Sequence, residues 1–119
     1  MRRVSYLGWL GGALLLARVA TAATLDRAII EKTIESHFEE VSACYQAGLD
    51  RNAELTGTVT VRLAIDKKGE VASVNVQSST LGDKPVEECI VKAVKTWKFP
   101  KPKGSGSVMA TYPFVLKTK

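Results

Sequence analysis

Apolar residues recur at intervals of three and four positions in two segments of the chain. The first segment runs from Thr24 to about Asp50, and the second from Asp83 to just before Pro100. At about 100° per residue each set falls on one stripe, which predicts two amphipathic helices. The first stripe contains Ile30, Ile34, Phe38, Val41, Tyr45 and Leu49, and the second contains Val86, Ile90, Val94 and Trp97.

Between and after these helices the pattern changes to alternation. Apolar and polar residues alternate over Thr58–Asp66, and the turn Asp66-Lys67-Lys68-Gly69 leads into a returning segment, Glu70–Ser79. This arrangement predicts a β-hairpin. The alternation is interrupted near Ala72-Ser73, which indicates a bulge. A final strand is predicted over Val108–Leu116.

The order helix, strand, strand, helix, strand predicts an α+β fold. Two helices with one apolar stripe each and a sheet with one apolar face form a two-layer sandwich, in which both helices cover one face of a three-stranded antiparallel sheet. A right-handed crossover through the second helix places the last strand beside the first, in the order second, first, last. Pro113 in the last strand supports this order, because a residue without an N–H is tolerated at a sheet edge.

The N-terminus has the features of an export signal. After two arginines it continues through an apolar run from Val4 to Ala17 and ends at Ala20-Thr21-Ala22, a small-x-small cleavage sequence. We therefore predict a signal peptide over residues 1–22 and a single domain over 23–119. That domain would be periplasmic or secreted and would keep no stable membrane span after cleavage. An uncleaved anchor, with Arg18 reaching toward the membrane surface, is the alternative.

The chain has two cysteines, Cys44 and Cys89. Each lies at the edge of a helical stripe, roughly 80° from its centre, so the two side chains are placed to meet between neighbouring helices. In an exported chain this placement predicts a disulfide between Cys44 and Cys89. The alternative is a pair of buried thiols that pack as small apolar residues.

Charge and composition exclude several classes of function. The net charge of +5 includes three arginines of the predicted signal, and the remaining domain carries only about +2. That charge is too small for a nucleic-acid-binding surface, so no nucleic-acid partner is expected. Lys98, Lys101 and Lys103 form a local basic cluster, which is typical of solvated surface.

No motif for catalysis or for cofactor binding accompanies this pattern. His37 is the only histidine and lies near the apolar stripe, which favours a hydrogen-bonded structural role. With one imidazole and no Cys-x-x-Cys spacing a metal site is not expected, and Ser78-Ser79 lacks the setting of a nucleophile. We therefore predict a protein that is not an enzyme and has no cofactor. Core packing is the predicted role of the aromatic residues Trp97, Phe99, Tyr112 and Phe114.

Several short motifs resemble one known family. They are Cys44-Tyr45, Val86-Glu87-x-Cys89-Ile90, Trp97-x-Phe99-Pro100-x-Pro102 and Tyr112-Pro113-Phe114. In these motifs the chain resembles the TonB C-terminal-like domain, and is most similar to its AgmX/PglI C-terminal branch. The resemblance implies a periplasmic protein-interaction module. In TonB proteins this domain captures a short extended segment of an outer-membrane receptor by adding it to a sheet edge. No proline-rich spacer follows the predicted signal, so binding rather than energy transmission is the expected role.

The predicted edge strand supplies candidate partner-binding residues. If the Pro113 nitrogen faces away from the first strand, Met109, Thr111 and Val115 direct their backbone groups the same way. A partner strand, from an envelope or outer-membrane protein, is then expected to pair mainly with Met109–Thr111. Lys101 and Lys103, in the preceding loop, are further candidate contacts.

Two other functions are compatible with the sequence. The solvent face of the sheet, where Thr58, Thr60 and Arg62 project, is suited to a small ligand or a cell-wall polymer. A cystatin-like secreted inhibitor shares the long first helix and the hairpin, but the chain has no inhibitory loop motif.

Overall fold

A computed structural model describes residues 24–104 and 106–118, so the predicted signal peptide lies outside the described residues. The described part contains three helices and three strands. They are α2 (Arg27–Ser36), α3 (Phe38–Arg51), β1 (Gly57–Ile65), β2 (Val71–Ser79), α4 (Lys84–Lys95) and β3 (Val108–Leu116).

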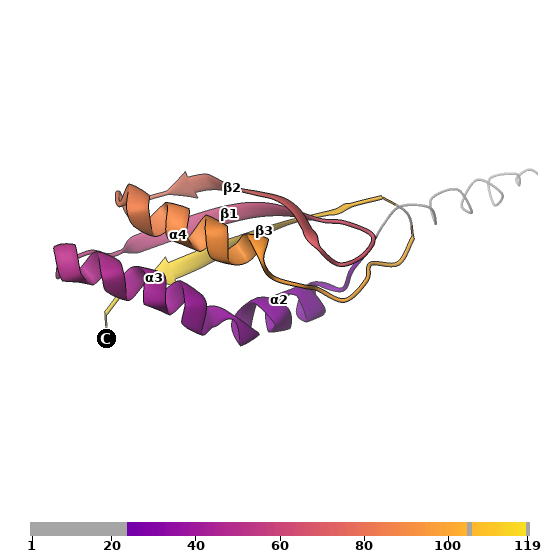
Figure 1. Ribbon diagram of the computed structural model, residues 1–119, viewed down its shortest axis with the longest axis horizontal. Helices are drawn as coiled ribbons and strands as arrows, with labels where there is room; N and C mark the ends of the chain where they lie inside the picture. Colours follow the sequence, from indigo (N-terminus) through magenta and orange to yellow (C-terminus); the bar gives the residue numbers. More distant parts are fainter. Residues whose placement is uncertain (1–23, 105, 119) are drawn as a thin grey trace, which may run out of the picture.

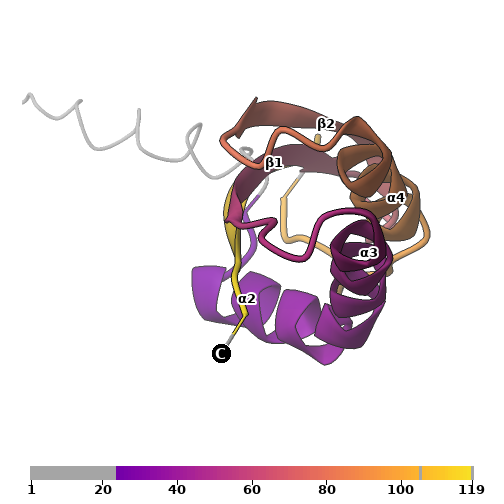
Figure 2. The same cartoon turned by 90° about the vertical axis from the view of Figure 1, so that its left-hand side faces the viewer.

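The predicted α+β sandwich is confirmed. The three strands form an antiparallel sheet in the order β2-β1-β3, as the edge position of Pro113 predicted. The helices form a second layer beneath it (Figure 1). Seen end-on, the sheet curves from β2 to β3 and all three helices lie on its inner side (Figure 2).

The prediction of one long first helix is wrong, because the helix breaks at His37. The hydroxyl of Thr33 donates to the Ile29 carbonyl at 2.9 Å, and that of Ser36 donates to the Thr33 carbonyl at 2.6 Å. Side chains of this kind compete with the backbone and weaken the end of a helix. His37 itself has φ −107° and ψ 10°, outside the helical range. The break turns α2 so that it lies below the β3 side of the sheet, while α3 packs against α4 (Figure 2).

The break also changes which residues are buried. Phe38 belongs to the stripe of a straight helix, yet 43% of its surface is exposed, because the helical phase restarts at the first residue of α3. Ile30 and Ile34 of α2 are buried, as are Val41 and Tyr45 of α3. Each half of the stripe therefore points into the core from its own helix.

The hairpin turn is closed by Asp66. Its side-chain Oδ1 accepts from the backbone N–H groups of Lys68 and Glu70, each at 2.9 Å. Gly69 has φ +86°, and a Cβ there would overlap the carbonyl oxygen of Phe99. The Phe99 N–H donates to the Gly69 carbonyl at 2.8 Å, so the turn is also tied to the segment after α4. A side chain at residue 69 would disturb both the turn and this contact.

β2 contains two bulges. Ala64 and Ile65 pair with Ser73 and Val71, which leaves Ala72 without a partner and confirms the predicted bulge. Thr60 and Val61 pair with Ser78 and Val76, so Gln77 is a second, unpredicted bulge. Each extra residue bends the strand and interrupts its ladder.

The core lies between the two layers, and a disulfide crosslinks its helical side. Cys44 of α3 is bonded to Cys89 of α4, with a Cα–Cα distance of 5.7 Å, which confirms the predicted pairing. The predicted core role of the aromatic residues also holds, because Trp97, Phe99 and Phe114 are buried and Tyr112 is half-buried. α3 and α4 are thus covalently joined within the helical layer.

Candidate functional site

β3 forms one free edge of the sheet. It pairs with β1 along its whole length, from Gly57 with Leu116 to Ile65 with Val108, without a bulge. No described strand pairs with its other side. An unpaired edge of this kind presents a row of backbone donors and acceptors that can template another strand.

The pairing of Thr58 determines which β3 residues point outward. The Thr58 N–H donates to the Thr80 hydroxyl, and its carbonyl accepts from the Thr80 N–H, both at 2.9 Å. The backbone of Thr58 therefore faces β2, and by alternation that of Thr60 does so too. Thr60 is the partner of Pro113, so the Pro113 nitrogen faces away from β1.

The same alternation gives the free backbone groups of the edge. Met109, Thr111 and Val115 share the outward direction with Pro113, and their side chains are exposed on the solvent face of the sheet. Pro113 removes one donor between Thr111 and Val115. The edge is therefore divided at Pro113. Its N-terminal half has two residues with both an outward N–H and an outward carbonyl, and its C-terminal half has one.

A cleft of about 810 Å³ runs along the N-terminal half, between β3 and α2. Met109 and Thr111 both line it. Opposite them, Arg27 and Glu31 of α2 form an ion pair at 3.1 Å. The remaining lining residues are Leu25, Ile30, Thr60, Val108, Ala110, Tyr112 and Pro113.

The C-terminal half of the edge borders a different cleft. This second cleft, of about 350 Å³, lies between α3 and the end of β3 and is lined by Phe38 and Val115, among others. Phe38 is 43% exposed and Val115 57% exposed, so apolar surface is open to solvent there. The predicted residue Val115 therefore does not share a cleft with Met109 and Thr111.

The floor of the larger cleft lies in an acidic environment. Burial raises the pKa of Tyr112, and the carboxylates of Glu35 and Glu31 raise it further. Both carboxylates belong to α2 and favour the neutral phenol. The cleft thus combines apolar side chains with the Arg27–Glu31 ion pair on its α2 wall.

The angle between α2 and α3 is held by one carboxylate. Glu40 accepts a hydrogen bond from the Trp97 indole N–H at 2.9 Å, and its other oxygen lies 2.9 Å from His37 Nδ1. The pKa of Glu40 is lowered, first by the Trp97 bond and then by His37. The His37 ring also stacks on Trp97, with centroids 4.8 Å apart. His37 is therefore a hydrogen-bonded structural residue, as predicted.

The two candidate lysines lie apart from the edge clefts. The backbone of Lys103 pairs with that of Thr24, with N–H to carbonyl distances of 2.8 and 2.9 Å. Lys101 and Lys103 are exposed, and neither lines the two clefts beside β3. The structure does not group them with Met109 and Thr111.

Sequence reasoning missed the α2 wall of the larger cleft. A straight first helix gave no reason to place Arg27 or Glu31 beside the last strand. One signal was present in the sequence: Ser36-x-x-Glu39 matches the pattern that often starts a helix. The structure starts α3 at Phe38, within one or two residues of that signal.

Two features are absent from the described residues. Nowhere in ranges 24–104 and 106–118 do three or more His, Cys, Asp or Glu side chains group into a possible metal site. Among the helices of those ranges, none has the length and apolar character needed to cross a membrane.

Comparison with known proteins gives one family and one structure. Residues 49–117 match the family described as Gram-negative bacterial TonB protein C-terminal. The fold is similar to the NMR structure of the Helicobacter pylori TonB C-terminal domain, residues 179–285, with 17% sequence identity and a TM-score of 0.44. That similarity covers 71% of this chain and 82% of the other. No curated protein matches the chain.

Proposed function

The chain belongs to the TonB C-terminal family, and from that premise we propose that it captures an extended segment of an envelope protein at the β3 edge. Domains of this family are interaction modules without enzymatic activity. The observation that carries the proposal is the outward backbone of Met109 and Thr111, which lies beside the cleft under α2. A segment added there gains main-chain hydrogen bonds from the edge and side-chain contacts from the cleft.

Pro113 determines how far the added segment pairs. Since Pro113 has no N–H to offer, a partner strand pairs with Met109 and Thr111 and stops before Val115. Alternate side chains of the partner then point into the α2 cleft and toward solvent.

The finer identity of the protein is also part of this proposal. The Cys44-Tyr45 pair and the setting of Cys89 support membership of the AgmX/PglI branch. The signal-like residues 1–22 support export to the periplasm or beyond, with an envelope or outer-membrane protein as the partner. The disulfide agrees with an oxidising compartment.

A pull-down from envelope extract tests the proposed function. The unmodified protein is compared with Thr111→Pro, which removes an outward donor in the proposed pairing half, and with Val115→Pro as the matched control. Both positions are exposed and have the same backbone direction as Pro113, so proline is tolerated at each. We expect one specific protein to be retained by the unmodified chain and by Val115→Pro, and lost with Thr111→Pro.

Two results would contradict the proposal. Equal retention by a folded Thr111→Pro variant would move the site toward the loop of Lys101 and Lys103 or to the opposite face of the sheet. Retention on purified cell-wall polymer, without a retained protein, would favour polymer binding on the solvent face, where Arg62 is exposed.

A further inference from the structure

The opposite edge of the sheet, on β2, has a short stretch that is free to pair. The bulges at Ala72 and Gln77 bound the stretch Ser73–Val76. Within it, Ser73 and Asn75 pair with Ala64 and Arg62 of β1, whose backbones face β2 by the same alternation that starts at Thr58. The backbone groups of Val74 and Val76 therefore point outward, away from the sheet.

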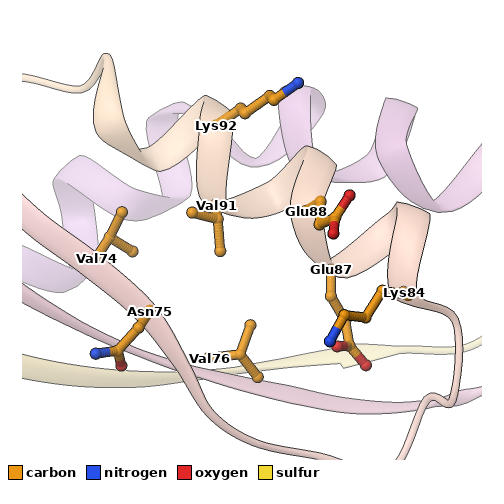
Figure 3. A pocket seen from close by; sticks show the side chains of 8 residues that line it. All are labelled: Val74, Asn75, Val76, Lys84, Glu87, Glu88, Val91 and Lys92. Carbon is orange, nitrogen blue, oxygen red and sulfur yellow. The ribbon is translucent and has the colours of Figure 1, made fainter.

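A groove lies along this stretch, between β2 and α4. Its volume is about 410 Å³, and Val74, Val76 and Val91 give it an apolar lining (Figure 3). Charged side chains of α4 form its rim, and in the described part of the chain none of them has an ion-pair partner. They are Lys84, Glu87, Glu88 and Lys92.

The charges are distributed unevenly along the groove. β2 and α4 are joined by a short connection, so α4 runs back over the strand that precedes it. Val91 and Lys92 consequently lie over Val74, whereas Glu87 lies toward Val76 (Figure 3). One end of the groove therefore carries Glu87 and Glu88 together with Lys84, a net charge of −1, and the other end carries Lys92 (Figure 3).

We propose that this edge pairs with the same edge of a second copy of the chain. A two-fold axis at Asn75 places Val74 opposite Val76 of the second copy, and the outward groups of these two residues then form main-chain hydrogen bonds across the axis. The same axis brings the Glu87 end of one α4 toward Lys92 of the other. The sequence Val-Asn-Val and the rim charges are thus both self-complementary.

Charge and size favour a second copy that binds reversibly. The four rim charges sum to zero, so two such surfaces meet without a net repulsive field. The free stretch is only four residues long, which places the contact among small, transient interfaces. The β3 edge stays open in this dimer, so the proposal is independent of partner capture there.

Sedimentation of the purified protein over a range of concentrations tests the dimer. We expect reversible association of the unmodified protein, and a dissociation constant at least about tenfold higher for Glu87→Lys or Lys92→Glu, because each change replaces two attractive pairs by two repulsive ones. An equimolar mixture of the two variants should restore association, since every Glu87–Lys92 contact again joins opposite charges. Lys95→Glu, on the same helix but outside the groove, is the matched control and should leave association unchanged.

Several results would overturn the proposal. Monomer at all concentrations up to about 1 mM would do so, because weaker association lies below the range of specific contacts. A dimer that both charge variants leave intact, or a mixture that fails to restore association, would also do so. Val76→Pro gives a second measure, since it removes an outward N–H; a folded Val76→Pro variant that still dimerises contradicts the pairing. If the unmodified protein stayed monomeric but bound a synthetic peptide of alternating Val and Thr, the β2 edge would be a site for a strand of another protein, and the dimer would be contradicted.

Discussion

The two edges of one small sheet limit strand pairing by different means. β3 pairs with β1 without interruption but carries Pro113 among its outward residues. β2 has no proline, and instead two bulges bound its regular stretch. Both devices are known to protect sheet edges from indiscriminate pairing. Here each device leaves a short stretch in which the outward residues keep both their N–H and their carbonyl. An edge can therefore be protected from indiscriminate pairing and still pair selectively.

The helices beside the two edges are also held differently. α2, beside β3, is joined to α3 through the break at His37 and the contacts of Glu40. α4, beside β2, is bonded to α3 by the disulfide. α3 therefore contacts both neighbours: α2 is continuous with it through the backbone of His37, and α4 is crosslinked to it by the disulfide.

Removing the disulfide should have the largest effect and should act on the β2 side. A crosslink between residues 45 apart is worth about 4 kcal/mol in the chain-entropy argument, and native disulfides of small domains typically contribute about 2–4 kcal/mol. We expect the double variant Cys44→Ala, Cys89→Ala to have a free energy of unfolding lower by about 2–4 kcal/mol. Denaturant unfolding with and without reductant measures it.

The double alanine variant also serves as the control, because it has no disulfide to reduce. Reductant should destabilise the unmodified protein and leave the double alanine variant unchanged. Association through β2 should weaken in the variant, while capture at β3 by the folded fraction should persist. If reduction left the unfolding midpoint of the unmodified protein in place, the crosslink would have no role in holding α4 on α3.

A crossed pair of proline variants should separate the two edges. Thr111→Pro should weaken partner capture by about 1 to 3 kcal/mol, the cost of an unsatisfied buried group, and leave self-association unchanged. Val76→Pro should weaken self-association and leave capture unchanged. Calorimetric titration with the protein retained in the pull-down measures the first effect, and sedimentation the second.

Stability is the necessary control for the crossed variants. Both substitutions lie on outward backbone positions, so thermal melting should change little in either. Two variants that lose the same activity would show that the edges act as one surface. That result, obtained with two folded variants, would contradict the conclusion that the β2 and β3 edges act separately.

Strand positions and their order were predictable from the sequence because they depend on local alternation and on one proline. The pairing of Cys44 with Cys89 was predictable because each helix near its cysteine keeps a regular phase. The break at His37 was not, since apolar spacing continued through it and the local hydroxyl bonds that Thr33 and Ser36 make are compatible with an unbroken helix as well. The larger cleft depends on that break, and its α2 wall was missed for the same reason.

A smaller effect is expected at the joint beside β3. Because the pKa of Glu40 is lowered in the folded protein, its charged form adds stability at all pH values above its unfolded pKa of about 4.5. That stability is lost as the pH falls through the lower, folded pKa. Glu40→Gln should therefore reduce the free energy of unfolding near pH 7 by less than about 1 kcal/mol, because the half-exposed carboxylate is screened by water.

The pH dependence of the unfolding free energy shows whether the Glu40 charge causes this effect. The difference in unfolding free energy between Glu40→Gln and the unmodified protein should shrink as the pH falls below 4.5, as measured by urea unfolding on both sides of that pH. Glu39→Gln, on the same helical turn, is the control and should show no such dependence. A constant difference at every pH would mean that the Glu40 charge does not support the joint.

The smallest effect is expected from the loop lysines. Lys101 and Lys103 are exposed and lie outside both clefts beside β3, so their charges can act on a partner only at long range. Lys101→Ala with Lys103→Ala should weaken partner capture by no more than a few tenths of a kcal/mol, mainly through a slower association rate at low salt. The Lys103 backbone pair with Thr24 remains in this variant, so the fold is preserved. Calorimetry at low and physiological salt tests this, and a loss as large as that of Thr111→Pro at both salt concentrations would place the partner on the loop instead of the β3 edge.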